Sequence, residues 1–394
     1  MFDGLRRSLG VWGNARQFVR DCTDPRALTI YSEGSVYASF LDPVMAALAE
    51  TRDAPVFYLS SDPDDPVLAN PPAYLRPYFV RGGALIYAFT NIKSGTLVMT
   101  MPDLNTFHLK RSVHPIHYVY LFHSMVSSHM VYREGAFDHY DSVLCVGPHH
   151  REEIRAWESK CELPAKNLHD HGYGVLDRLL SARASYPGSD AGASAETGYD
   201  LLLAPSWGPE GVLETIGLEL VSVLIEAGHR VTVRPHPRTR ELAPDKIKAL
   251  ASLFSQNPRF RMEFDTTNFD SLHSSHLMIS DWSGAAAEYA FGLERPVLFV
   301  DVPRKVNNPR WESIGIDPLE ASYREHVGAI IDPADLARAA SKVASLCADP
   351  AAFAERIRDY RDRYVYNVGS SDRAAAELIS AIAADPVDGL VHPR

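Results

Sequence analysis

The sequence predicts an α/β protein of two doubly wound halves, each built around a parallel sheet. Three observations predict this fold class. The chain has 394 residues, which exceeds what one hydrophobic core usually serves, so two domains are expected. Short apolar runs rich in β-branched and aromatic residues alternate with helical patterns, as βαβ units require. The alternation is interrupted by the small, polar stretch 181–197 and then starts again.

Each expected strand is an apolar run bounded by turn residues, and each expected helix follows the turn after a strand. In the first half, strands are expected at 27–31, 56–60, 84–88, 96–100, 117–122 and 142–146, and helices at 43–50 and 149–160. In the second half, strands are expected at 201–204, 230–233, 260–264, 277–279 and 296–300. The second-half helices are expected at 212–227, 244–256, 285–290, 333–347, 351–364 and 372–384.

These series predict an N-terminal domain at 1–185, a linker at 186–198 and a C-terminal domain at 199–394, with the last helix free to pack back on the N-terminal domain. Ligands of doubly wound sheets bind outside the carboxyl ends of the strands. The ligand cleft is therefore expected between the two domains.

Composition argues against several classes of protein. The net charge of −11 argues against a general nucleic-acid binder. The four cysteines are scattered, so neither a disulfide framework nor a zinc site is expected. No apolar run reaches 18 residues and no signal-peptide pattern opens the chain, so a cytoplasmic protein is expected.

The first twenty residues interleave apolar and arginine side chains. This pattern fits a basic amphipathic helix on an anionic membrane surface, such as the inner face of the plasma membrane. It also fits a helix packed on its own domain, which is the interpretation we prefer.

The stretch 277–291, LMISDWSGAAAEYAF, reads as a strand, a small-residue turn and a helix N-terminus. Such a turn exposes unpaired backbone N–H groups that bind phosphate. Ser280, Asp281, Ser283 and Gly284 form this turn. Ser283 is either a phosphate ligand or an ordinary N-cap. Glu288, five residues further on, either reaches a ribose diol or is a solvated helix residue.

Other polar residues also follow strands. Arg234 and His236 lie in Arg-Pro-His-Pro after the expected strand 230–233, where two prolines hold the imidazole in one direction. His236 can donate to a phosphate oxygen, or it is a surface histidine in a rigid turn. Ser206 follows the strand 201–204, and His123 follows 117–122. His123 is either a general base for an acceptor hydroxyl or a cap on a strand end.

The segments 234–237 (RPHP) and 280–290 (SDWSGAAAEYA) resemble the donor-site motifs of the CDP-glycerol glycerophosphotransferases, the teichoic-acid and capsule polymerase or primase enzymes. The segments 296–303 (PVLFVDVP) and 366–379 (YNVGSSDRAAAELI) are similar to the C-terminal half of that family. The resemblance covers roughly 201–379 well and the first half only loosely.

The resemblance implies a GT-B fold, in which two Rossmann-like domains face an interdomain cleft. It also implies transfer of glycerol phosphate, or a related polyol phosphate, from a CDP-linked donor to a saccharide or polyol-phosphate acceptor, free or lipid-linked. Such a reaction builds cell-surface polymers such as teichoic acid, capsule or lipopolysaccharide. Neither a metal nor a cofactor besides the donor is expected.

By the same resemblance, the donor pyrophosphate lies on Ser280, the backbone beside Asp281, Ser283 and Gly284, against Arg234 and His236. Ser206 belongs to the same donor site, and His123 takes the place of the acceptor-side base. Two positions depart from the family pattern. The residue after His123 is Ser124 where the family usually has glycine, and the loop 204–211 lacks the usual basic residue.

Three other functions fit the same residues. A GT-B glycosyltransferase would use a CMP-sugar (Kdo or sialic acid) or a UDP-sugar. An epimerase of UDP-N-acetylhexosamine would need further acidic groups in the cleft, for which Glu33, Asp103 and Glu134 are candidates. A non-catalytic nucleotide-sugar-binding subunit would bind without turnover.

Overall fold

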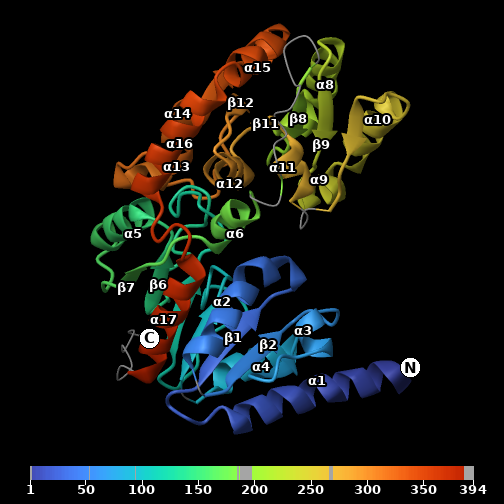
Figure 1. Cartoon of the computed structure of the whole chain (residues 1–394). Coiled ribbons are helices and arrows are strands. Elements are labelled where there is room, and N and C mark those ends of the chain that lie inside the picture. Colours follow the sequence, from blue (N-terminus) through green and yellow to red (C-terminus); the bar gives the residue numbers. More distant parts are fainter. Residues whose placement is uncertain are drawn as a thin grey trace.

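The computed structural model describes residues 2–52, 54–93, 95–183, 186, 198–265 and 269–385, without the side chains of 2–9 and 36. Two domains lie one above the other, each with a parallel sheet between helices (Figure 1). The last helix of the N-terminal domain before the expected linker ends at Ala182, and the first strand of the C-terminal domain begins at Asp200. The expected linker, 186–198, lies outside the described residues except for Tyr186 and Gly198.

The N-terminal sheet has seven parallel strands in the order β3-β2-β1-β4-β5-β6-β7. The order reverses between β1 and β4, which opens a crevice at the carboxyl ends of these two strands. The strands are β1 Leu28–Ser32, β2 Val56–Ser60, β3 Leu75–Phe79, β4 Thr96–Met99, β5 His117–Leu121, β6 Ser142–Cys145 and β7 Asn167–Asp170.

Helices cover both faces of this sheet. Phe18 of α1 and Ala88 of α4 belong to the apolar core on one face. Leu41 of α2 and Ala375 of α17 belong to the core on the other face. The helices of this domain are α1 Phe2–Asp21, η1 Ser35–Tyr37, α2 Ala38–Thr51, α3 Pro66–Ala69, α4 Gly83–Asn91, α5 Pro148–Lys160 and α6 Gly174–Ala182, joined by the C-terminal α17 Ser371–Ala384.

The C-terminal sheet has six parallel strands in the order β10-β9-β8-β11-β12-β13, and it reverses between β8 and β11. The strands are β8 Asp200–Leu203, β9 Arg230–Val233, β10 Phe260–Met262, β11 Leu277–Ser280, β12 Val297–Val300 and β13 Gly328–Ile331. The helices are α7 Val212–Thr215, α8 Gly217–Glu226, α9 Pro237–Leu242, α10 Pro244–Phe254, α11 Asp270–Ser274, α12 Gly284–Leu293, η3 Trp311–Ile314, α13 Leu319–Ser322, α14 Arg324–Val327, η4 Pro333–Arg338, α15 Ala339–Cys347 and α16 Pro350–Tyr364.

The two domains share a packed interface. A Cβ atom on Gly292 of α12 would lie 2.7 Å from Leu179 Cβ of α6, so glycine lets these two helices touch. Glu320 of α13 accepts hydrogen bonds from the backbone N–H (2.9 Å) and the hydroxyl (2.7 Å) of Ser127 in the N-terminal domain. The segment that follows His123 is therefore anchored on the C-terminal domain.

The predicted α/β class is confirmed, but several elements differ from the prediction. The run 84–88 is not a strand; it lies in α4, because a short apolar run fits a buried helix as well as a strand. The sequence patterns did not reveal β3, β7 and β13. Strand β3 contains Pro77, and proline is tolerated there because β3 lies at the edge of the sheet. The expected helix 212–227 is two helices that meet at Ile216.

Helix α1 lies along the base of the N-terminal domain (Figure 1). Phe18 is fully buried, and its ring packs against the rings of Phe57 (6.1 Å between centroids) and Tyr78 (5.6 Å). The second half of the helix therefore packs on its own domain. Membrane contact by residues 1–20 stays a prediction. In the described part of the chain, no helix has the length and apolar character needed to cross a membrane.

Candidate functional site

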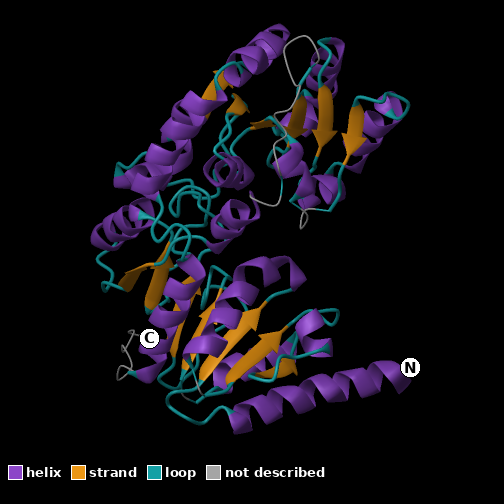
Figure 2. Ribbon diagram, viewed as in Figure 1, coloured by secondary structure: helices purple, strands orange, loops and turns teal. Residues whose placement is uncertain are grey.

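The carboxyl ends of the two sheets face each other across the domain interface, as the arrowheads in Figure 2 show. The loops that carry the predicted site residues follow β5 in the N-terminal domain and β8, β9 and β11 in the C-terminal domain. The predicted residues therefore gather where the two sheets meet.

The turn between β11 and α12 has the geometry of an anion-binding helix start. Ser283 is the N-cap of α12, and its hydroxyl accepts from the N–H of Ala285 at 3.3 Å. A Cβ atom on Gly284 would lie 2.9 Å from the Oγ of Ser124, which follows His123. The predicted phosphate turn thus lies directly against the segment that carries the predicted base.

Hydrogen bonds of Ser206, Ser280 and Asp281 join the loop after β8 to the turn after β11. Asp281 is completely buried and accepts from the N–H (2.7 Å) and the hydroxyl (3.1 Å) of Ser206. Ser280 donates its hydroxyl to the carbonyl of Ala204 at 2.8 Å. Burial raises the pKa of Asp281. The side chains of Ser280 and Asp281 therefore hold the loop after β8 against the turn after β11, rather than pointing to solvent.

His236 is oriented by its own helix. It caps α9, and its Nδ1 accepts from the N–H of Arg238 at 3.1 Å. Because Nδ1 is the acceptor, Nε2 carries the proton and can donate to a ligand. Burial, followed by the charges of Lys305 and Arg238, lowers the pKa of His236 to about 4. His236 is therefore a neutral hydrogen-bond donor at physiological pH.

Arg234 lies on the far side of the same loop. Its Nε donates to Glu263 at 3.1 Å and its Nη2 donates to the carbonyl of Asp265 at 3.2 Å. The residue is largely buried. Arg234 thus ties the end of β9 to the segment after β10, and its contact with a donor stays a prediction.

Lys305 is a cation of this site that sequence reasoning missed. It follows β12, and its Nζ lies 3.6 Å from the centre of the Trp207 ring. The Trp207 ring also packs beside His236, with 6.1 Å between centroids. Burial lowers the pKa of Lys305 to about 8, while the nearby Asp281 opposes this shift. Lys305 thus places a positive charge on Trp207 of the loop 204–211, which has no basic residue of its own.

One ring nitrogen of His123 has no hydrogen-bond partner in the part of the chain that the structure describes. Its Nδ1 lies 3.0 Å from the carbonyl of Thr100. A carbonyl can only accept, so Nδ1 carries the proton and Nε2 keeps its lone pair. The edge of the Tyr37 ring packs on the imidazole at 5.4 Å between centroids. Burial lowers the pKa of His123 to about 4, so the imidazole is neutral at physiological pH.

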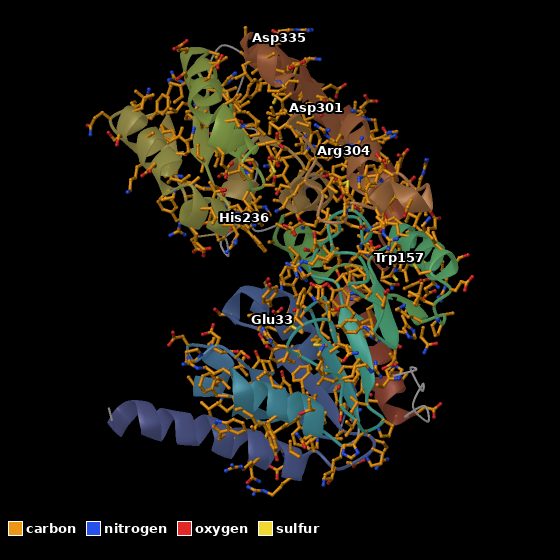
Figure 3. All side chains as sticks on the ribbon, turned by 180° about the vertical axis from the view of Figure 1, so that it is seen from behind. Glu33, Trp157, His236, Asp301, Arg304 and Asp335 are labelled. Carbon is orange, nitrogen blue, oxygen red and sulfur yellow. The ribbon has the colours of Figure 1, made fainter. Side chains whose placement is uncertain are left out.

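A hollow of about 420 Å³ lies beside His123, where the strand order reverses between β1 and β4. Glu33, Asp103, Tyr37 and Phe107 also line it. Burial raises the pKa of Glu33 to about 7. Figure 3 shows Glu33 and His236 on the facing edges of the two domains.

Glu288 bonds across the domain interface. Its Oε1 accepts from the Tyr173 hydroxyl at 2.6 Å, and the same hydroxyl lies 3.3 Å from the carbonyl oxygen of His123. Glu288 is thus not a solvated helix residue, and its contact with a ribose stays a prediction. Across the described residues, no three His, Cys, Asp or Glu side chains form a cluster that could hold a metal ion.

Several solved structures have the same architecture. The wall teichoic acid polymerase TagF, soaked with CDPG, is 16% identical, with 96% of this chain and 94% of that chain covered and a TM-score of 0.61. The UDP-GlcNAc 2-epimerase from Neisseria meningitidis, bound to UDP-GlcNAc, is 11% identical, with coverages of 90% and 99% and a TM-score of 0.56. A putative UDP-N-acetylglucosamine 2-epimerase from Listeria monocytogenes is 12% identical, with coverages of 94% and 100% and a TM-score of 0.56. The fold is GT-B-like.

At these identities the likeness establishes the fold alone. No family model and no curated protein matches the chain.

Proposed function

We propose that the protein transfers glycerol phosphate, or a related polyol phosphate, from a CDP-linked donor to a hydroxyl of an acceptor. One observation carries this proposal. The turn before α12, a helix N-terminus capped by Ser283, lies against Ser124, next to a histidine whose Nε2 is available as a base. A phosphate donor and an acceptor hydroxyl can therefore meet between the two sheets. The similarity in fold to a teichoic acid polymerase soaked with CDPG supports the choice of donor.

In this reaction His123 Nε2 takes the proton of the acceptor hydroxyl. The acceptor oxygen attacks the β-phosphorus of the donor and forms a new P–O bond. The bond between that phosphorus and the bridging oxygen breaks, and CMP leaves with the electron pair. The imidazole is a weak base while it is buried and uncharged, but a bound pyrophosphate favours its protonated form.

The charge on the leaving group is met by fixed groups of the C-terminal domain. The N-terminus of α12 offers backbone N–H groups, His236 offers its Nε2–H, and Lys305 offers a positive charge. These groups replace the charge that a metal would supply. Turnover in the presence of EDTA is therefore expected to match turnover without it.

The decisive test is nucleotide release from a panel of donors: CDP-glycerol, CDP-ribitol, CMP-Kdo, CMP-sialic acid and UDP-sugars. We expect CMP release from the CDP-polyols. Release only from the sugar nucleotides would refute the proposal. His123→Ala is expected to lower kcat about 100-fold or more while the donor KM changes little, because it removes only the base. A non-catalytic binding subunit would release no nucleotide, so His123→Ala would not change the result of this assay.

A second candidate is epimerisation of UDP-N-acetylhexosamine. It is favoured by Glu33 and Asp103, which place two carboxyl groups in the hollow beside His123. Glu134, the third acidic candidate, pairs with Arg310 and does not line that hollow. Conversion of UDP-N-acetylglucosamine to its 2-epimer, without nucleotide release, would establish this activity instead.

A further inference from the structure

The hollow beside His123 holds acidic groups that the transfer reaction does not use. Glu33 forms no hydrogen bond or ion pair with any residue that the structure describes. Asp103 makes one ion pair, at 3.8 Å, with Arg133, whose side chain is largely exposed. Carboxyl oxygens accept hydrogen bonds from hydroxyls, and the ionised form of the group also repels phosphates. These acceptors therefore favour a ligand that carries hydroxyl groups and no negative charge.

The walls of the hollow fit the same kind of ligand. Phe107 is 51% exposed, and Tyr37 lies on the opposite element, η1. Their rings offer flat apolar surfaces to the C–H faces of a hydroxylated ring or chain. Arg133 packs over the Phe107 ring at 4.9 Å, but its charge is already opposed by Asp103.

The hollow also lies where the acceptor has to bind, beside His123. His123 lines it, and the Nε2 of His123 is the nitrogen that is not bonded to Thr100. A hydroxyl held there lies next to this histidine, and the residue that follows the histidine, Ser124, contacts the turn at Gly284. An occupant of this hollow is thus the reacting end of the acceptor.

We propose that this hollow binds the terminal unit of the acceptor as an uncharged polyhydroxyl group, a saccharide or a polyol, and that Glu33 accepts a hydrogen bond from one of its hydroxyls. The inference rests on the proposed function. It assigns Glu33 to acceptor binding and selects an unphosphorylated terminal unit over a phosphorylated one.

The test compares matched acceptors with the donor that releases nucleotide. The pairs are glycerol with glycerol 1-phosphate, and a methyl glucoside with its 6-phosphate. We expect the uncharged member of at least one pair to form the phosphodiester product roughly tenfold faster or more. The pair that shows this preference indicates whether the acceptor unit is a polyol or a saccharide. A preference for the phosphorylated members overturns the inference.

Substitution of Glu33 gives a second test. Glu33→Gln is expected to raise the acceptor KM about tenfold or more, while the donor KM and the release of nucleotide to water stay the same. The matched control is Glu50→Gln, the same chemical change at an exposed site on α2. An unchanged acceptor KM overturns the inference. A loss confined to kcat overturns it too, since it would make Glu33 the base.

The two proposals fail in different ways. Nucleotide release to water that no uncharged acceptor accelerates contradicts this inference alone. Absence of release from every donor contradicts the proposed function. Saturation-transfer NMR of the same four compounds needs no turnover. It is expected to show contact with glycerol or the methyl glucoside that Glu33→Gln weakens, and contact only with the phosphorylated compounds would overturn the inference.

Discussion

Substitution of Lys305 is the sharpest test of the proposed donor site. Lys305 lies beside His236 only because of the tertiary fold. Its Nζ lies on the Trp207 ring, beside His236, and Asp281 is close enough to oppose the fall in its pKa. Lys305→Met removes the positive charge and keeps much of the apolar stem. We expect this change to weaken binding of the donor pyrophosphate.

The magnitude follows from the kind of contact that is lost. A hydrogen bond to a charged group contributes about 1.5–3 kcal/mol, which corresponds to roughly 10–150-fold in affinity. Lys305 is only partly buried, so solvent screens its charge and the lower end, about tenfold, is expected. With a pKa of about 8, roughly nine-tenths of the free enzyme carries the charge at pH 7 and roughly one-tenth at pH 9.

Two series of measurements check this reasoning. The donor KM of the wild type is expected to rise as pH increases through about 8, since the lysine becomes neutral there. His236, with a pKa of about 4, is neutral throughout this range. The donor KM of Lys305→Met is expected to be higher at pH 7 and to lose this pH dependence. Lys246→Met, at an exposed position on α10, is the matched control. A wild-type donor KM in Lys305→Met would refute the role.

Two further predictions concern the domain interface. Gly284→Ala places a Cβ atom 2.9 Å from Ser124 Oγ, so we expect a loss of about 1 kcal/mol in stability and weaker donor binding. If this contact is the cause, adding Ser124→Ala restores part of the stability and part of the donor affinity. Additive effects of the two substitutions would contradict this explanation. Glu320→Ala leaves the N–H and hydroxyl of Ser127 without their acceptor, so urea denaturation should show a loss of roughly 3 kcal/mol in the free energy of unfolding. The control Glu312→Ala, at an exposed position, should change this free energy little. Equal losses in the two variants would contradict the role of the Glu320–Ser127 contact.

Much of the fold was accessible from local patterns. Interior strands such as β2 and β9 appear in the sequence as short runs rich in β-branched or aromatic residues with turn residues at both ends, and their predicted bounds match the structure. Of the edge strands, β10 was predicted, and the others lack this pattern. Three strands were missed, β3, β7 and β13, and each lies at the edge of its sheet. One face of such a strand can remain polar or half-exposed, so the apolar signal weakens.

The sequence predicted that the candidate residues lie at one edge of each sheet, but it did not predict the contacts of their side chains. Ser283, Gly284, His236 and His123 were singled out because they follow strands, and carboxyl ends of parallel strands share one edge. The roles of individual side chains could not be read in this way. Asp281 bonds to Ser206, 75 positions away in the chain, and no local pattern encodes such a pairing.

The sequence by itself determined the α/β class, the turn before α12 and the histidines at two strand ends, because these depend on backbone periodicity and on neighbours along the chain. Only the tertiary structure decided which polar groups are free to act. Packing buried Asp281 against Ser206, placed Lys305 on Trp207 beside His236, and left Glu33 in the hollow of His123 without a partner among the described residues. Burial and proximity set the hydrogen-bonding capacity and the pKa of each group, and both arise only when distant segments of the chain come together.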